Sequence, residues 1–140
     1  MKSKKISMFI VLLTLLTTYS TASNKLNDFN GNWHLRVMDG KEVRKARAIV
    51  DFHSKDMLLM GFDGCNRFSG ELKKGLENTF SSKVRISRMA CRQYIHKFVS
   101  SRLQTTIKEG FTVKEERKYG IDGITIKSKS HTLFLKHMGS

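Results

Sequence analysis

Two cysteines, Cys65 and Cys91, carry the most reactive side chains in this chain of 140 residues. A cysteine paired with a histidine base can act as a nucleophile, but neither cysteine lies in a recognisable cysteine-hydrolase signature. An even number of cysteines in a small exported domain favours a disulfide instead. We therefore expect Cys65 and Cys91 to be bonded to each other, with two buried free thiols as the alternative.

The remaining residue types that support catalysis or metal binding form no motif. The histidines are His34, His53, His96, His131 and His137. None lies at zinc-ligand spacing from a cysteine or carboxylate, which favours solvated surface histidines. The acids Asp51, Asp56, Asp63, Glu71 and Glu77 are scattered, and no glycine-rich phosphate loop is present. The sequence predicts no catalytic residue, no metal site and no cofactor.

The first residues resemble an export signal. Lys2, Lys4 and Lys5 precede an apolar run over 6–16, and the small residues 21–23 follow a short polar stretch. This order is typical of a signal peptide, which we predict over 1–22, followed by a loose lead-in over 23–31. The apolar run is about half of the ~20 residues that span a bilayer, and a membrane anchor is the alternative. No cysteine precedes Cys65, so we expect an exported, periplasmic or secreted protein without a lipid anchor.

The chain is strongly basic, with a formal net charge of +14. A basic protein attracts polyanions, although general solubility explains the charge equally well. Because export removes the chain from nucleic acid, we expect an anionic lipid or lipopolysaccharide surface, or an envelope protein, as the partner. The residues predicted to bind an anion are Lys83, Arg85, Arg88 and Arg92.

Short alternating segments dominate the rest of the chain and predict half-buried strands. The predicted strands cover 33–38, 46–52, 57–62, 68–72, 83–87, 111–113, 124–126 and 132–135. The run 57–62 is almost continuously apolar, as in a central strand. No linker, proline or internal repeat divides the chain, so 32–137 is predicted to be one domain with a tail over 138–140, and to be monomeric.

One segment has a helical period. Between 92 and 109 the apolar residues recur every three or four positions, and Gly110 follows as a helix C-cap. One helix can cover a face or an open end of a curled sheet. The predicted fold class is α+β, mainly antiparallel β: a curled sheet or partly open barrel of about eight strands with one amphipathic helix.

The segment Gly64-Cys65-Asn66-Arg67-Phe68-Ser69-Gly70 resembles the signature of the META domain, the family of the bacterial heat-shock protein HslJ. A second family element is matched by Met89-Ala90-Cys91, and a tryptophan near the first strand by Trp33. The resemblance implies a small β-rich domain in the bacterial envelope, often linked to stress or drug tolerance. It also implies a structural likeness to a lipid-binding pilotin of type III secretion systems.

The motif residues have simple structural interpretations. Gly64 can supply a positive φ at a turn, Asn66 can bond to nearby backbone, and Phe68 can fill the core. Gly70 suits a bulge or a close approach of neighbouring backbone. With no catalytic motif, we expect a non-enzymatic envelope protein that binds a lipid or protein component. The alternatives are a pilotin-like or chaperone-like interaction module and an inhibitor of an exported enzyme.

Overall fold

The computed structural model describes residues 29–139, so the predicted signal peptide over 1–22 and the lead-in up to 28 lie outside the described residues, as does Ser140. The described part has ten strands and one α-helix. The strands are β1 (Gly31–Met38), β2 (Lys41–Glu42), β3 (Ile49–His53), β4 (Leu58–Phe62), β5 (Arg67–Lys74), β6 (Phe80–Ser82), β7 (Arg85–Ile86), β8 (Phe111–Lys118), β9 (Ile121–Ser128) and β10 (Thr132–His137). The helix α1 is Tyr94–Glu109.

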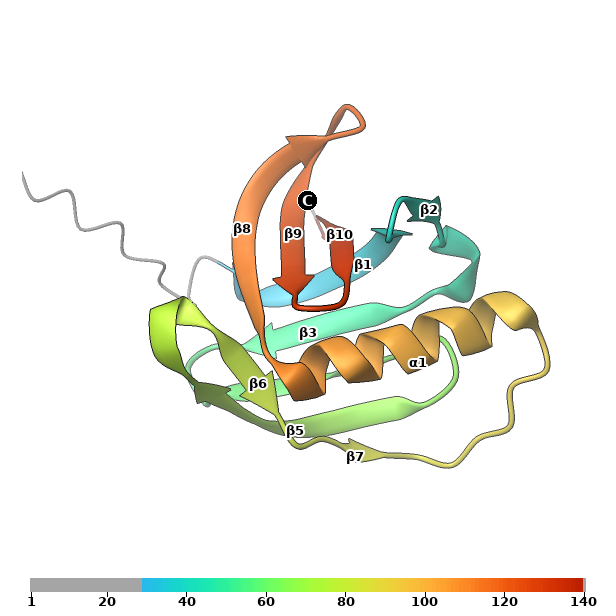
Figure 1. Cartoon of the computed structure of the whole chain (residues 1–140), viewed down its shortest axis with the longest axis horizontal. Helices are drawn as coiled ribbons and strands as arrows, with labels where there is room; N and C mark the ends of the chain where they lie inside the picture. Colours follow the sequence, from blue (N-terminus) through green and yellow to red (C-terminus); the bar gives the residue numbers. More distant parts are fainter. Residues whose placement is uncertain (1–28, 140) are drawn as a thin grey trace, which may run out of the picture.

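Eight of these strands form a ring in the order β1-β3-β4-β5-β6-β8-β9-β10, and β10 pairs with β1 to close it. Neighbouring strands are antiparallel throughout, and β2 and β7 attach beside the ring. The link from β6 to β8 is the single residue pair Phe80 and Phe111, so the ring is not a regular barrel (Figure 1). The predicted curled sheet with about eight strands and one helix is confirmed.

Helix α1 lies across the ring and contributes to its core (Figure 1). Its buried side chains include Val99, Leu103 and Ile107, which follow the helical spacing seen in the sequence. They join a core with large buried residues such as Phe52 and Phe111. Burial of each large apolar side chain contributes roughly 1.5–3 kcal/mol, so this face of α1 fixes the helix against the sheet.

Helix α1 and the second long strand begin later than predicted. The helix starts at Tyr94 and not at 92, and it ends at Glu109, with Gly110 at φ 97° as its cap. The strand predicted from 46 starts at Ile49, because the residues before it form a short 3₁₀ helix, Arg44–Ala46. The residue that caps this 3₁₀ helix, Arg47, has φ 57°. This left-handed conformation lies outside the range of an extended strand.

The sequence analysis missed two short strands and misjudged the lead-in. Strands β2 and β6 have two and three residues, too few to show an alternating period. Residues 29–31, predicted to be loose, belong to the fold: Phe29 is 4 % exposed, and its carbonyl oxygen accepts a hydrogen bond from Trp33 Nε1 at 2.8 Å. Strand β1 already begins at Gly31.

Candidate functional site

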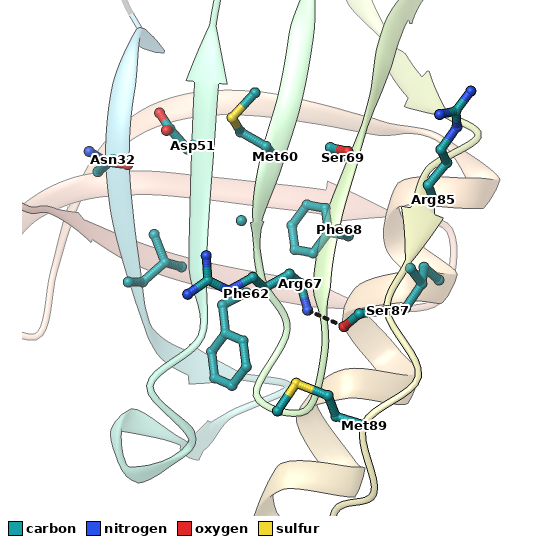
Figure 2. Close-up of a pocket in the computed structure, with 13 residues that line it drawn as sticks. Asn32, Asp51, Met60, Phe62, Arg67, Phe68, Ser69, Arg85, Ser87 and Met89 are labelled. Atoms are coloured by element: carbon teal, nitrogen blue, oxygen red, sulfur yellow. Dashed lines mark hydrogen bonds between the residues drawn. The ribbon is translucent and has the colours of Figure 1, made fainter.

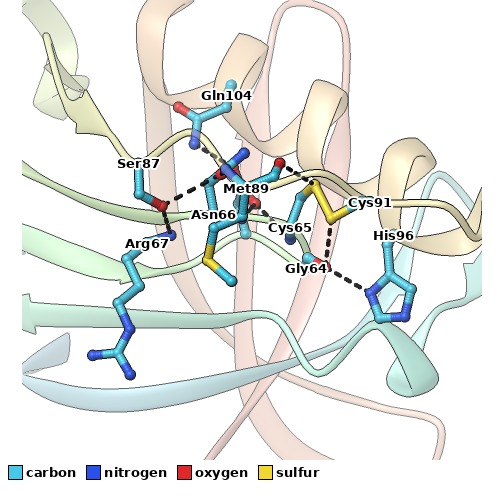
Figure 3. Close-up of a disulfide and its surroundings, with 10 residues drawn as sticks. Gly64, Cys65, Asn66, Arg67, Ser87, Met89, Cys91, His96 and Gln104 are labelled. Carbon is cyan, nitrogen blue, oxygen red and sulfur yellow. Dashed lines mark hydrogen bonds between the residues drawn. A yellow bond between two sulfur atoms is a disulfide. The ribbon is translucent and has the colours of Figure 1, made fainter.

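A disulfide joins Cys65 to Cys91, as predicted, with their Cα atoms 5.6 Å apart (Figure 3). Cys65 lies in the turn between β4 and β5, and Cys91 lies in the segment that leads into α1. The bond therefore ties the sheet to the chain that follows β7.

Beside the disulfide, Asp63 organises the turn that the motif residues build. Its side chain is fully buried. One carboxylate oxygen accepts hydrogen bonds from the backbone N–H groups of Cys65 at 2.8 Å and Asn66 at 2.6 Å. The other accepts a bond from the Gln104 side chain on α1 at 2.8 Å. The sequence analysis named Asp63 only among the scattered acids, although an aspartate side chain that bonds to the backbone N–H two residues later is a known turn signal.

Asn66 extends this support to the segment after β7 (Figure 3). Its side-chain oxygen accepts hydrogen bonds from the Met89 backbone N–H at 2.6 Å and from the Ser87 hydroxyl at 3.3 Å. Ser87 also bonds to Arg67 twice, since its Oγ accepts from the Arg67 N–H and its own N–H donates to the Arg67 carbonyl oxygen, both at 3.0 Å. The segment 87–91 is thus held at a fixed place beside β5.

The other residues of the motif also contact the framework. Gly64 has φ 95°, and its carbonyl oxygen lies 2.6 Å from Nδ1 of His96, so that nitrogen carries the proton. A Cβ on Gly70 would lie 2.6 Å from the Ser82 hydroxyl, which explains the glycine as a site of close approach. Phe68 is 3 % exposed and belongs to the core, as does Trp33.

An open groove of about 950 Å³ lies on the face of β3, β4 and β5 that is turned away from the core, with β7 and the segment after it as one wall (Figure 2). It is lined by Asn32, Ile49, Asp51, Met60, Gly61, Phe62, Arg67, Phe68, Ser69, Arg85, Ile86, Ser87 and Met89. We call it the outer groove. Five of its residues are apolar side chains outside the core: Ile49, Met60, Phe62, Ile86 and Met89.

Strand alternation places Ile49, Met60 and Phe62 on the outer face. Val50 and Leu59 point into the core, so their neighbours Ile49 and Met60 point the other way. Ile86 and Met89 are among the most exposed large apolar residues of the described chain, at 44 % and 60 %. An exposed apolar set of this kind is a typical mark of a binding surface.

Two arginines give the outer groove its positive charge. Arg85 pairs with Ser69, two residues beyond Arg67 on β5, so the two arginines are diagonal neighbours on one face. Such neighbours have Cα atoms roughly 7–8 Å apart, within the reach of long side chains. Among residues 29–139, neither guanidinium takes part in any of the ion pairs, which involve other cations. Both charges are free to meet a ligand.

The one acid of the groove, Asp51, is already engaged. Its carboxylate lies 2.8 Å from His53 Nε2, and the side-chain amide of Asn32 lies close enough to donate to the same carboxylate. These contacts reduce the repulsion that Asp51 would exert on an anion at the arginines.

The predicted anion-binding residues are only partly brought together. Arg85 lines the outer groove, whereas Lys83, Arg88 and Arg92 are exposed but lie outside its lining. The second arginine that lines the groove is Arg67. The sequence analysis named it only as a member of the family motif. Its position on the outer face follows from the alternation with the buried Phe68, a signal that the sequence already contained.

The titratable groups with shifted pKa values are not among the residues that line the outer groove. Burial, with the charges of Arg36 and Arg44, lowers the pKa of His34. Hydrogen bonds from Ser128 and Ser130 lower the pKa of Glu109. Within the part of the chain that the structure describes, no three metal-ligating side chains gather into a site. Among residues 29–139, no helix has the length and apolar character to cross a membrane.

Comparison with known proteins identifies the family. The META domain profile matches residues 24–137. A solved structure determined by NMR is 24% identical to this chain, covering 76% of it and 88% of its own chain, with a TM-score of 0.61. Another NMR structure, of a protein from Burkholderia xenovorans, is 16% identical to this chain and has a TM-score of 0.62. The match covers 82% of this chain and 87% of that protein's chain.

The likeness to these two solved structures establishes a shared fold. A separate search of curated proteins finds no match. The profile match covers the whole of the described domain and includes both the Gly64–Gly70 motif and the Cys65–Cys91 pair. The chain therefore belongs to the META domain family.

Proposed function

We propose that this protein is an exported, non-enzymatic binding protein of the bacterial envelope, and that its outer groove binds an anionic lipid component. The observation that carries the proposal is the combination of exposed apolar side chains with two unpaired arginines in one groove. The expected biological role is envelope stress tolerance, in keeping with the family.

The chemistry of the groove fits an anionic amphiphile better than a small polar metabolite. Exposed apolar residues such as Ile86 and Met89 gain free energy when they leave water, at roughly 25 cal/mol for each Å² buried. Methionine side chains adapt to irregular apolar partners, and Met60 and Met89 both line the groove. Arginine matches phosphate and carboxylate groups with two parallel hydrogen bonds. The formal net charge of +14 attracts such anions over a longer range.

The non-enzymatic part of the proposal is supported by what the motif residues do. Asp63, Asn66 and the two cysteines bond to backbone groups or to each other and position the wall of the groove. The export part is supported by the N-terminal sequence pattern and by the disulfide, which persists in oxidising compartments. Cell fractionation that finds the uncleaved, reduced chain in the cytosol would contradict export.

Co-sedimentation with vesicles tests the lipid part. We expect binding to vesicles that contain phosphatidylglycerol, weak binding to pure phosphatidylcholine, and release from the anionic vesicles as salt is raised toward about 0.5 M. Equal binding to both lipids, or binding that ignores salt, would contradict the proposal.

A second candidate function, a protein-interaction module, is favoured by strand β7. Among the strands of residues 29–139, β7 pairs only with β5, so its other edge can accept a strand from a partner. Crosslinking in cells followed by mass spectrometry separates the two functions. A single envelope protein captured through residues 84–87, together with indifference to lipid, would favour the interaction module.

A further inference from the structure

The outer groove has an apolar end and a mixed end, where Met60 lies beside polar side chains. Figure 2 shows Asn32, Asp51 and Ser69 toward one end, and Phe62 and Met89 toward the other. The Arg67 side chain extends from β5 across the neighbouring strand, between these two ends (Figure 2). A charged group on Arg67 therefore has an apolar surface beside it, toward Phe62 and Met89, for an attached chain.

The wall beside the apolar end is held before any ligand arrives. Met89 is fixed through its backbone N–H by the Asn66 side chain, and two residues later Cys91 is bonded to Cys65. The Cys65 sulfur also lies 3.7 Å from the Met89 carbonyl oxygen. A preformed wall lowers the entropy lost on binding, which favours a defined site for one molecule.

The size of the groove also suits a single molecule. Its volume of about 950 Å³ lies within the range of roughly 300–1,000 Å³ that is usual for small-molecule sites. Its floor is recessed below the wall, since Ile49, Met60 and Phe62 are only partly exposed whereas Met89 on the wall is 60 % exposed. A flat bilayer would contact the wall but would leave much of the floor unfilled.

We infer that the outer groove binds one anionic single-chain amphiphile at a time, with its phosphate or carboxylate on Arg67 and its chain over Phe62 against Met89. Arg85, whose side chain points away from Arg67 in Figure 2, adds positive charge that attracts the anion over a longer range. This inference rests on the proposed lipid-binding function and narrows it, because it requires an individual molecule in the groove and not only a membrane surface.

Amide chemical-shift mapping of isotope-labelled protein tests the inference with three probes: decyl phosphate below its micelle concentration, decyl maltoside as the chain without charge, and inorganic phosphate as the head without a chain. We expect decyl phosphate to saturate at one site and to shift the amides of 60–62, 67–69 and 85–89. The maltoside and the inorganic phosphate should each bind at least about tenfold more weakly, because each lacks one of the two contacts.

Two matched variants locate the site. Arg67→Gln should weaken decyl phosphate binding about tenfold or more, and Lys127→Gln, the same loss of charge on β9 away from the groove, should leave it unchanged. Folding of each variant is checked by its amide spectrum. Equal affinity for decyl phosphate and the maltoside, shifts centred outside the groove, or equal effects of the two variants would overturn the inference.

The vesicle experiment keeps the two proposals apart. Salt-sensitive binding to anionic vesicles without saturable decyl phosphate binding would overturn the single-molecule site and leave membrane association intact. Failure of both would contradict the lipid-binding function itself.

Discussion

Replacing Asp63 with alanine should be one of the most damaging single changes in the described domain. The Asp63 side chain is completely buried and makes no contact with solvent. Alanine would remove the acceptor for the backbone N–H groups of Cys65 and Asn66 and for the amide of Gln104. It would also leave space that the surrounding backbone has to fill.

The expected magnitude follows from the two backbone groups. A hydrogen bond to a charged group contributes about 1.5–3 kcal/mol, so the two bonds contribute roughly 3–6 kcal/mol, and we take about 4 kcal/mol because both are only part-buried. A domain of this size has a total stability of about 5–15 kcal/mol. Asp63→Asn keeps one side-chain oxygen for the turn, and Gln104 can rotate its amide to meet the new NH₂ group. We therefore expect Asp63→Asn to recover more than half of the loss.

Urea unfolding followed by tryptophan fluorescence measures these differences, since the single Trp33 lies in the core. With a slope of about 2 kcal/mol per molar urea, Asp63→Ala should move the midpoint down by about 2 M. The control is Asp122→Ala, at an exposed acid on β9, which should change stability by less than about 0.5 kcal/mol. An Asp63→Ala protein within about 1 kcal/mol of the native chain would refute the role assigned to this carboxylate.

Two further predictions concern the disulfide and one exposed carboxylate. Changing both Cys65 and Cys91 to serine should lower the free energy of unfolding by roughly 3.6 kcal/mol, because the bond closes a loop with a sequence separation of 26. Urea curves measure the loss, and two free thiols in the denatured, unreduced native chain would contradict the bond. The pKa of Glu109 is lowered by hydrogen bonds from Ser128 and Ser130, so the stability it contributes is present above its ordinary pKa of 4.5 and is lost as pH falls through the lower folded value. The urea midpoint of the native chain should therefore fall more steeply below pH 4.5 than that of Glu109→Gln, and parallel curves would contradict this.

The sequence predicted the framework of the fold because its signals are local. Alternation located most strands, and the three-and-four spacing from Ile95 to Ile107 located α1 within two residues of its start. The two cysteines and the family motif predicted the disulfide. The missed strands β2 and β6 are set by their neighbours in the sheet and carry too few residues for a period.

The outer groove could not be predicted, because its residues come from separate strands. The run 57–62 reads as a buried central strand, yet Met60 and Phe62 face outward and only Leu59 of strand β4 is buried. A continuous apolar run does not reveal which of its alternating side chains face the core and which face outward. The pairing of β7 with β5, which brings Arg85 beside Arg67, is a long-range contact that no local pattern encodes.

The most direct test of lipid binding in the outer groove compares two double variants on phosphatidylglycerol vesicles at low salt. Arg67→Gln with Arg85→Gln removes both groove arginines, and Lys108→Gln with Lys127→Gln removes the same charge from a region outside the groove lining. We predict that the first variant loses at least about tenfold in vesicle affinity, while the second stays within about twofold of the native chain. Equal losses in the two variants would show that net charge alone drives the association and would contradict a lipid site in the groove.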